Sequence, residues 1–297
     1  MSRVRFRYGQ HETFTVRHGW LPKGLAALTR SADALRGDPE AADRLGLGSK
    51  MVPSLAFWME ACGLARRDPG SGAGRMGMML TGLGEAVRDA DPYLEHPATL
   101  WLLHLQISGQ EGTAWNWFFT EFDDRSFDRN ACADAFVRYT RDRAQKPATP
   151  AMAAKDVACL LLTYASDPAG DREDADDVAG SPLRDLGLLW RHATTGRFER
   201  RHADGIPPEA LLACARTVAS GRLAVPLSEL AHARRGAGRL LGMRPGDVAD
   251  AAEAAAGKYR ADGVQVITLA GDRVLSVPAH GPQFWLRRAL QRPELAA

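Results

Sequence analysis

The chain has 297 residues, which is long enough for two or three domains. Of these residues 45% are hydrophobic and 25% are charged, a composition typical of globular proteins. Its formal net charge of +2 excludes a uniformly polybasic nucleic-acid-binding protein. No apolar run approaches the ~18 residues that span a membrane, and the opening MSRVRFRYGQ has no apolar signal segment. We therefore expect a cytoplasmic protein with no membrane partner.

The charges are unevenly distributed along the chain. Basic residues exceed acidic ones by five over residues 1–75 and by six over 184–244, whereas acidic residues exceed basic ones by five over 121–177. Anionic partners would therefore bind near the ends of the chain. The widely spaced cysteines, Cys62, Cys132, Cys159 and Cys214, lack zinc-ligand spacing and predict buried free thiols.

The opening block, residues 9–24 (GQHETFTVRHGWLPKG), carries the first candidate chemistry. His11 and Glu12 are candidate catalytic residues, because this pair can perform acid–base chemistry or contribute to a metal site. Neighbouring residues of a strand point to opposite faces, so the pair needs a turn to converge. Arg17 and Lys23 are candidates for holding phosphate. The alternative is a structural arm with an ion-paired histidine.

Residues 45–93 predict a winged helix-turn-helix. The glycine-containing segment 45–49 makes the turn, Ser49 caps the following helix, and Gly63 ends it. A basic loop and a strand-like edge follow, and the exposed start of the helix offers few base-reading side chains, which favours contact with phosphates. The alternative is a protein-docking module. The predicted DNA-binding residues are Arg17, Lys23, Ser49, Lys50, Arg66, Arg67 and Arg75.

The remaining chain predicts a mainly α-helical protein. We expect an N-terminal arm and winged helix over 1–100, a helical middle domain over 101–200, and a helical, winged-helix-like domain over 205–297. Two β-branched runs around Ala-Gly-Asp-Arg predict a β-hairpin over 264–278. With the helices from residue 227 onward, this hairpin repeats the winged-helix order.

Two further clusters have a functional and a structural interpretation. The acidic run 171–177 (DREDADD) can hold Mg²⁺, which a phosphodiesterase uses, although such runs are more often solvated. The aromatic group within 115–122 can stack on single-stranded bases, but its density favours a core. Walker, G-x-S-x-G, HExxH and C-x-x-C motifs are absent from the sequence.

A set of segments in a fixed order resembles domain-of-unknown-function family 4007, the SspB-like subunits of bacterial Ssp DNA phosphorothioation systems. The matching segments are GQHETFTVRHGWLPKG, DRLGLGSKMVPSLAFWMEACGL, LTGLGEAV, DPYLEHPATLWLLHLQI, TAWNWFFTEF, KDVACLLLTYA and DDVAGSPLRDLGLL. They cover roughly residues 6–190, and the set is specific although each segment alone is not. The C-terminal third fits less distinctly.

The resemblance implies a DNA-nicking subunit in a system that replaces a non-bridging phosphate oxygen with sulfur for antiphage defence. It implies double-stranded DNA, a cysteine desulfurase, an ATPase and an ATP-pyrophosphatase-like enzyme as partners; self-association into a homo-oligomer is a further partner hypothesis. A nickase would use a divalent metal such as Mg²⁺. Three hypotheses follow: a DNA-nicking component, a non-catalytic DNA-binding adaptor, and a protein-docking subunit.

Overall fold

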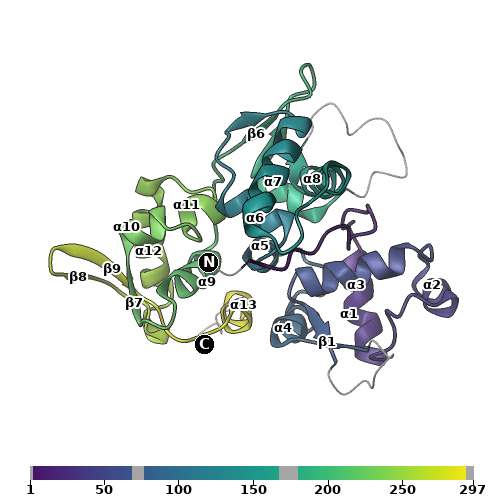
Figure 1. The fold of residues 1–297 in the computed structure, drawn as a ribbon. Helices are drawn as coiled ribbons and strands as arrows, with labels where there is room; N and C mark the ends of the chain where they lie inside the picture. The colour runs from purple at the N-terminus through teal and green to yellow at the C-terminus, as the bar shows by residue number, and fades with distance from the viewer. Residues whose placement is uncertain (1–2, 69–76, 167–179, 292–297) are drawn as a thin grey trace. The chain divides into compact units, whose positions relative to one another are not determined.

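The computed structural model describes residues 3–68, 77–166 and 180–291 (Figure 1). The chain forms two compact units: residues 1–85 with 106–201, and residues 86–105 with 202–297. Both are mainly helical, as the periodicity predicts, and both carry small sheets. Arg75 and the acidic run 171–177 lie outside the described residues.

The first unit opens with an extended arm and three helices, α1 (Trp20–Arg30), α2 (Pro39–Leu45) and α3 (Met51–Ala61). The side chain of Asp38 caps α2 by accepting a hydrogen bond from the Ala41 amide at 2.7 Å. Gly46, with φ of 59°, ends that helix and begins the predicted turn. The prediction that Ser49 caps α3 is wrong, because Lys50 occupies the cap position and makes no side-chain cap bond.

A two-stranded antiparallel pair follows α3. Strand β1 (Ala65–Arg67) pairs with β2 (Met78–Leu80), with Ala65 opposite Leu80. Gly63, with φ of 67°, separates α3 from β1 as predicted. Helix α4 (Gly82–Ala90) and then α5 (Pro97–Gly109) carry the chain into and out of the second unit.

The rest of the first unit combines helices with a sheet that the sequence analysis did not predict. Its helices are α6 (Ala114–Thr120), α7 (Arg129–Arg143), α8 (Pro150–Tyr164) and the 3₁₀ turn η1 (Pro182–Leu186). Its strands, β3 (Ser126–Phe127), β4 (Ala165–Ser166), β5 (Leu189–Arg191) and β6 (Phe198–Arg200), pair in the order β3-β6-β5-β4. Each has only two or three residues, too few to show alternation in sequence.

The second unit contains α9 (Pro208–Ala219), β7 (Ala224–Pro226), α10 (Leu227–His232), α11 (Ala237–Leu240), α12 (Pro245–Lys258), η2 (Arg260–Asp262), β8 (Val266–Leu269), β9 (Asp272–Ser276) and α13 (Pro282–Leu290). The hairpin predicted over 264–278 is confirmed by the antiparallel pairing of β8 with β9. Strand β7 pairs with the other edge of β9, which gives the order β7-β9-β8.

The aromatic group around α6 belongs to the core. All five of its members are at most 5% exposed: Trp115, Trp117, Phe118, Phe119 and Phe122. Their burial removes them as a stacking surface for bases and supports the structural interpretation. None of the helices within the described residues is long and apolar enough to cross a membrane.

Candidate functional site

The most constrained part of the opening block is the segment 9–14, which we call the His11 turn. Gly9, Glu12 and Thr13 have positive φ values of 66°, 49° and 67°. A non-glycine residue in this conformation costs ~1–2 kcal/mol. Two consecutive ones persist only where surrounding contacts fix the backbone.

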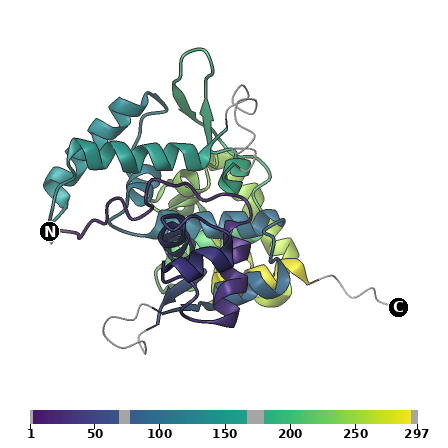
Figure 2. The same cartoon turned by 90° about the vertical axis from the view of Figure 1, so that its right-hand side faces the viewer.

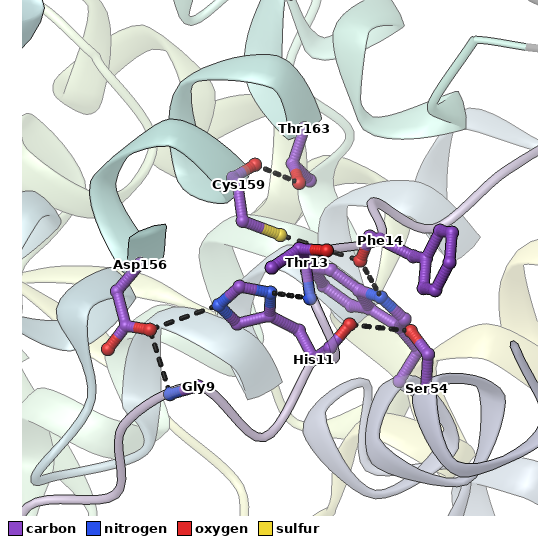
Figure 3. Close-up of polar contacts among 9 residues, drawn as sticks. Gly9, His11, Thr13, Phe14, Ser54, Asp156, Cys159 and Thr163 are labelled. Atoms are coloured by element: carbon purple, nitrogen blue, oxygen red, sulfur yellow. Dashed lines mark hydrogen bonds and ion pairs between the residues drawn. The ribbon is translucent and has the colours of Figure 1, made fainter. Parts of the chain in front are cut away.

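A buried histidine and a buried carboxylate supply those contacts (Figure 3). His11 Nε2 lies 3.0 Å from Asp156 Oδ1, and both residues are 1% exposed. The Thr13 amide donates to His11 Nδ1 at 3.1 Å. Because Nδ1 accepts this bond, the ring proton sits on Nε2 and is donated to the carboxylate. Asp156 Oδ1 also accepts the Gly9 amide at 2.8 Å.

The carbonyl groups of the turn are anchored to α3 and α8. Ser54 Oγ donates to the His11 carbonyl at 2.9 Å, and Trp58 Nε1 donates to the Phe14 carbonyl at 3.0 Å. Cys159 Sγ of α8 also points at the Phe14 carbonyl, at 3.5 Å (Figure 3). The His11 turn therefore joins the first three-helix segment to α8.

The candidate catalytic pair is not brought together by this turn. Both ring nitrogens of His11 are hydrogen-bonded inside the protein, whereas Glu12 is exposed. In this arrangement His11 holds the turn and does not face solvent. Glu12 is the member of the pair that a substrate can reach.

Sequence reasoning missed Asp156, the partner of His11. Its signal was present, because a single aspartate stands within the apolar helical segment KDVACLLLTYA. A carboxylate on the buried face of a helix requires a hydrogen-bond partner. The sequence alone does not identify that partner, which lies 145 residues away along the chain.

Four of the seven predicted DNA-binding residues lie at the two ends of α3. Ser49 and Lys50 are exposed at its start, and Arg66 and Arg67 are exposed on β1 beyond its end. One face of the helix is covered, since Ser54 and Trp58 are fully buried beneath the His11 turn. Arg17, on the segment before α1, is half-buried.

Some of these cations already make contacts within the protein. Arg67 Nε lies 3.6 Å from Glu60 Oε2, so part of its charge is neutralised within the protein. Lys23 Nζ donates to the Leu45 carbonyl at 3.1 Å, which places it beside the turn between α2 and α3. A cavity of about 600 Å³ adjoins Lys23 and is also lined by Arg30 and Arg44. The structure therefore groups Lys23 with two arginines that sequence reasoning did not select.

Metal and thiol chemistry find little support in the described residues. Within 3–68, 77–166 and 180–291, no group of three His, Cys, Asp or Glu side chains is placed to hold a metal ion. All four cysteines are buried free thiols, as predicted. Burial raises the pKa of Cys132 and of Cys214 to about 12, so neither thiol forms a thiolate nucleophile near neutral pH.

Comparison with known proteins gives two kinds of similarity. A family model described as "Protein of unknown function (DUF4007)" matches residues 8–289. A structure titled "SspB crystal structure" aligns with a TM-score of 0.83 and 25% sequence identity, covering 98% of this chain and 91% of that chain. A structure titled "Magnesium ion-bound SspB crystal structure" aligns with a TM-score of 0.84, 26% identity and the same coverage. No curated protein matches the chain.

Proposed function

The chain belongs to the DUF4007 family, and from that premise we propose that it is a DNA-binding and DNA-nicking component of an Ssp-type DNA phosphorothioation system. The observation that carries the proposal is the alignment with SspB over 98% of the chain at 25% identity. A likeness of this extent covers both units.

The element order supports DNA binding through winged helices. In the first unit, α1, α2 and α3 are followed by the antiparallel pair β1 and β2. In the second, the order is α9, β7, α10, α11, α12, η2 and the β8–β9 hairpin, with β7 pairing against β9. We assign a winged helix to each segment, because both orders place a helix before a two-stranded wing.

The location of the cations supports binding to phosphates over reading of base edges. Lys50 precedes α3, while Arg66 and Arg67 follow it on β1, so they are separated by an 11-residue helix about 16 Å long. On the face of α3 that the His11 turn covers, Ser54 and Trp58 are buried, so that face offers no side chain to a groove. Lysine and arginine at both ends fit the backbone of a duplex, which carries no direct sequence information.

For the nicking reaction we assign His11 a positioning role and Glu12 a role at the substrate. The His11–Asp156 pair fixes the backbone that presents Glu12 at the surface. An exposed carboxylate can accept a proton from a water that attacks the phosphorus. The bond from phosphorus to one sugar oxygen then breaks, and solvent water protonates that leaving oxygen.

A plasmid assay tests this proposal. Supercoiled plasmid incubated with the full chain and Mg²⁺ should become open circular. The variant Lys50→Ala/Arg66→Ala/Arg67→Ala should lose salt-sensitive gel shifts and nick more slowly, because three phosphate contacts are gone. A control variant removes three exposed cations outside the two winged-helix segments: Arg129→Ala, Arg138→Ala and Lys155→Ala.

The outcomes separate the parts of the proposal. Plasmid that stays supercoiled at high protein concentration, with normal gel shifts, would contradict nicking by the isolated protein. If the Lys50/Arg66/Arg67 variant bound DNA as the control does, the assigned face would be wrong. Equal nicking by Glu12→Gln and the unsubstituted protein would remove Glu12 from the reaction.

A second candidate function is a non-catalytic adaptor that positions partner enzymes on DNA. The burial of His11 favours it, because the strongest acid–base candidate of the sequence faces the interior. The second unit adds a surface suited to protein partners: α12 exposes Asp250 and Glu253, and β8 exposes Ile267 and Leu269. Exposed aliphatic side chains suit docking of the proposed desulfurase, ATPase or ATP-pyrophosphatase-like enzyme.

A further inference from the structure

The extended segment 3–8, which we call the arm, has two chemically different faces. Arginines and apolar or aromatic residues alternate along it in the order Arg-Val-Arg-Phe-Arg-Tyr. In extended backbone, successive side chains point to opposite sides. The alternation therefore gives the arm one cationic side and one apolar side.

The apolar side of the arm is packed on α7. The Phe6 ring lies 6.0 Å from the ring of Phe136 and 6.2 Å from that of Tyr139, measured between centroids. The Tyr8 ring lies 6.2 Å from that of Phe136. Figure 2 shows the purple arm running beside the teal helices. These contacts hold the arm against the protein, with its other side free for a partner.

Backbone hydrogen bonds fix the position of the arm. The Val4 amide donates to the Arg143 carbonyl at 2.8 Å, and the Gln145 amide donates to the Val4 carbonyl at 2.9 Å. Tyr8 OH donates to the Lys146 carbonyl at 2.9 Å. The loop between α7 and α8 is thereby joined to both ends of the arm, and Lys146 is held beside it.

The middle of the arm lies directly against Gly112, where only glycine fits. The Arg7 amide donates to the Gly112 carbonyl at 2.9 Å. Gly112 has φ of +74°, and a Cβ placed there would lie 2.5 Å from the Arg5 carbonyl oxygen. Any other residue would combine backbone strain with a collision against the arm.

The cationic side presents three charges. Arg3, Arg5 and Lys146 are exposed, and none of them has an ion-pair partner among the residues that the structure describes. The neighbouring cations differ, because Arg7 lies 3.4 Å from Glu60 and Arg143 lies 3.7 Å from Glu121. Glu60 and Glu121 are thus paired with Arg7 and Arg143, and the three exposed cations can bind a partner.

The spacing and rigidity of these cations fit a regular polyanion. The Cα atoms of Arg3 and Arg5 are two extended residues apart, about 6.7 Å. The packed aromatic side holds the arm in place, so less conformational entropy is lost on binding than for a free tail. Arginine pairs with phosphate through two parallel N–H groups.

We propose that the arm and Lys146 form a second binding surface for the sugar–phosphate backbone of DNA, separate from the cations around α3. This inference rests on the proposed function, because the polyanion is taken to be the DNA on which the protein acts. It assigns a binding role to a segment that the sequence analysis treated only as an arm.

Duplex DNA titrated over a range of salt concentrations tests the proposal. The variant Arg3→Gln/Arg5→Gln/Lys146→Gln should bind at least about tenfold more weakly than the unsubstituted full chain. The slope of log K against log salt should become shallower by about 3, one for each lost phosphate contact. The control removes the same number of charges from exposed residues outside the two winged-helix segments: Arg129→Gln, Arg138→Gln and Lys155→Gln.

A second variant separates the position of the arm from its charge. Gly112→Ala keeps every cation but displaces the arm, and should also weaken binding while circular dichroism still reports a folded protein. An arm variant that binds as tightly as the control would overturn this inference and leave DNA binding intact. If the unsubstituted protein did not bind DNA at all, both the proposed function and this inference would be overturned.

Discussion

At the scale of single residues, His11 and Asp156 show how burial changes the role of a reactive side chain. Next to Glu12 in sequence, His11 has the residue type of an acid–base catalyst. In the structure, its two nitrogens bond to Asp156 and to the Thr13 amide. The imidazole thereby stabilises two non-glycine residues with positive φ, and the chemistry left to the turn belongs to Glu12.

His11→Ala should lower the free energy of unfolding by about 2–4 kcal/mol, because it leaves the buried Asp156 carboxylate without its side-chain donor. Urea unfolding followed by circular dichroism measures the change. Glu12→Ala is the matched control on the adjacent exposed residue and should change stability by less than about 0.5 kcal/mol. Equal stability of His11→Ala and the control would show that the pair does not hold the turn.

At the scale of elements, the packing around α3 sets what this helix can contact. The His11 turn, which accepts hydrogen bonds from Ser54 and Trp58, covers one face of the helix. Beyond it, Thr81 joins the next two elements: its hydroxyl donates to the Gly63 carbonyl and accepts the Gly84 amide at 3.0 Å. Helix α4 is thus capped by the same residue that holds the end of α3.

Gly84→Ala should destabilise the protein by at least about 2 kcal/mol, because an added Cβ would lie 1.9 Å from the Leu64 carbonyl oxygen, a backbone atom that cannot move freely. Thermal unfolding provides the measurement. In α12, Gly257 has nothing within 4 Å of an added Cβ, so Gly257→Ala should instead stabilise by about 0.5–1 kcal/mol. A neutral Gly84→Ala would mean that α4 does not approach Leu64 this closely.

At the scale of the whole molecule, the two units are not consecutive in sequence. Residues 86–105 belong to the unit formed otherwise by 202–297. Within it, Leu102 and Leu103 are fully buried, and His104 Nε2 donates to the Leu240 carbonyl at 2.6 Å. The chain therefore leaves the first unit after residue 85, contributes residues 86–105 to the second unit, and re-enters the first unit at residue 106.

A chain ending at Arg201 should aggregate, because it keeps residues 86–105 but loses the partners that bury their apolar side chains. Size-exclusion chromatography would show the loss of the monodisperse species. Replacing 86–105 in that shortened chain by a flexible Gly/Ser linker should restore solubility. A soluble, folded 1–201 chain would contradict the division into units.

Much of the fold was accessible from sequence because its signals are local. Apolar periodicity located the main helices, glycines at 46 and 63 marked two helix ends, and the β-branched runs located the β8–β9 hairpin. The ordered segments also indicated the family that the comparison over residues 8–289 shows. Each of these signals lies within a few neighbouring residues or in their order along the chain.

The sequence by itself determined a mainly helical chain, its C-terminal hairpin and its family, since these depend on local preference and segment order. Only the tertiary structure decided which charged groups are available to a partner. It buried His11 against Asp156, 145 residues away, and left Arg3 and Arg5 exposed. The physical reason is that burial and ion pairing depend on contacts between distant segments, which residue type and spacing do not specify.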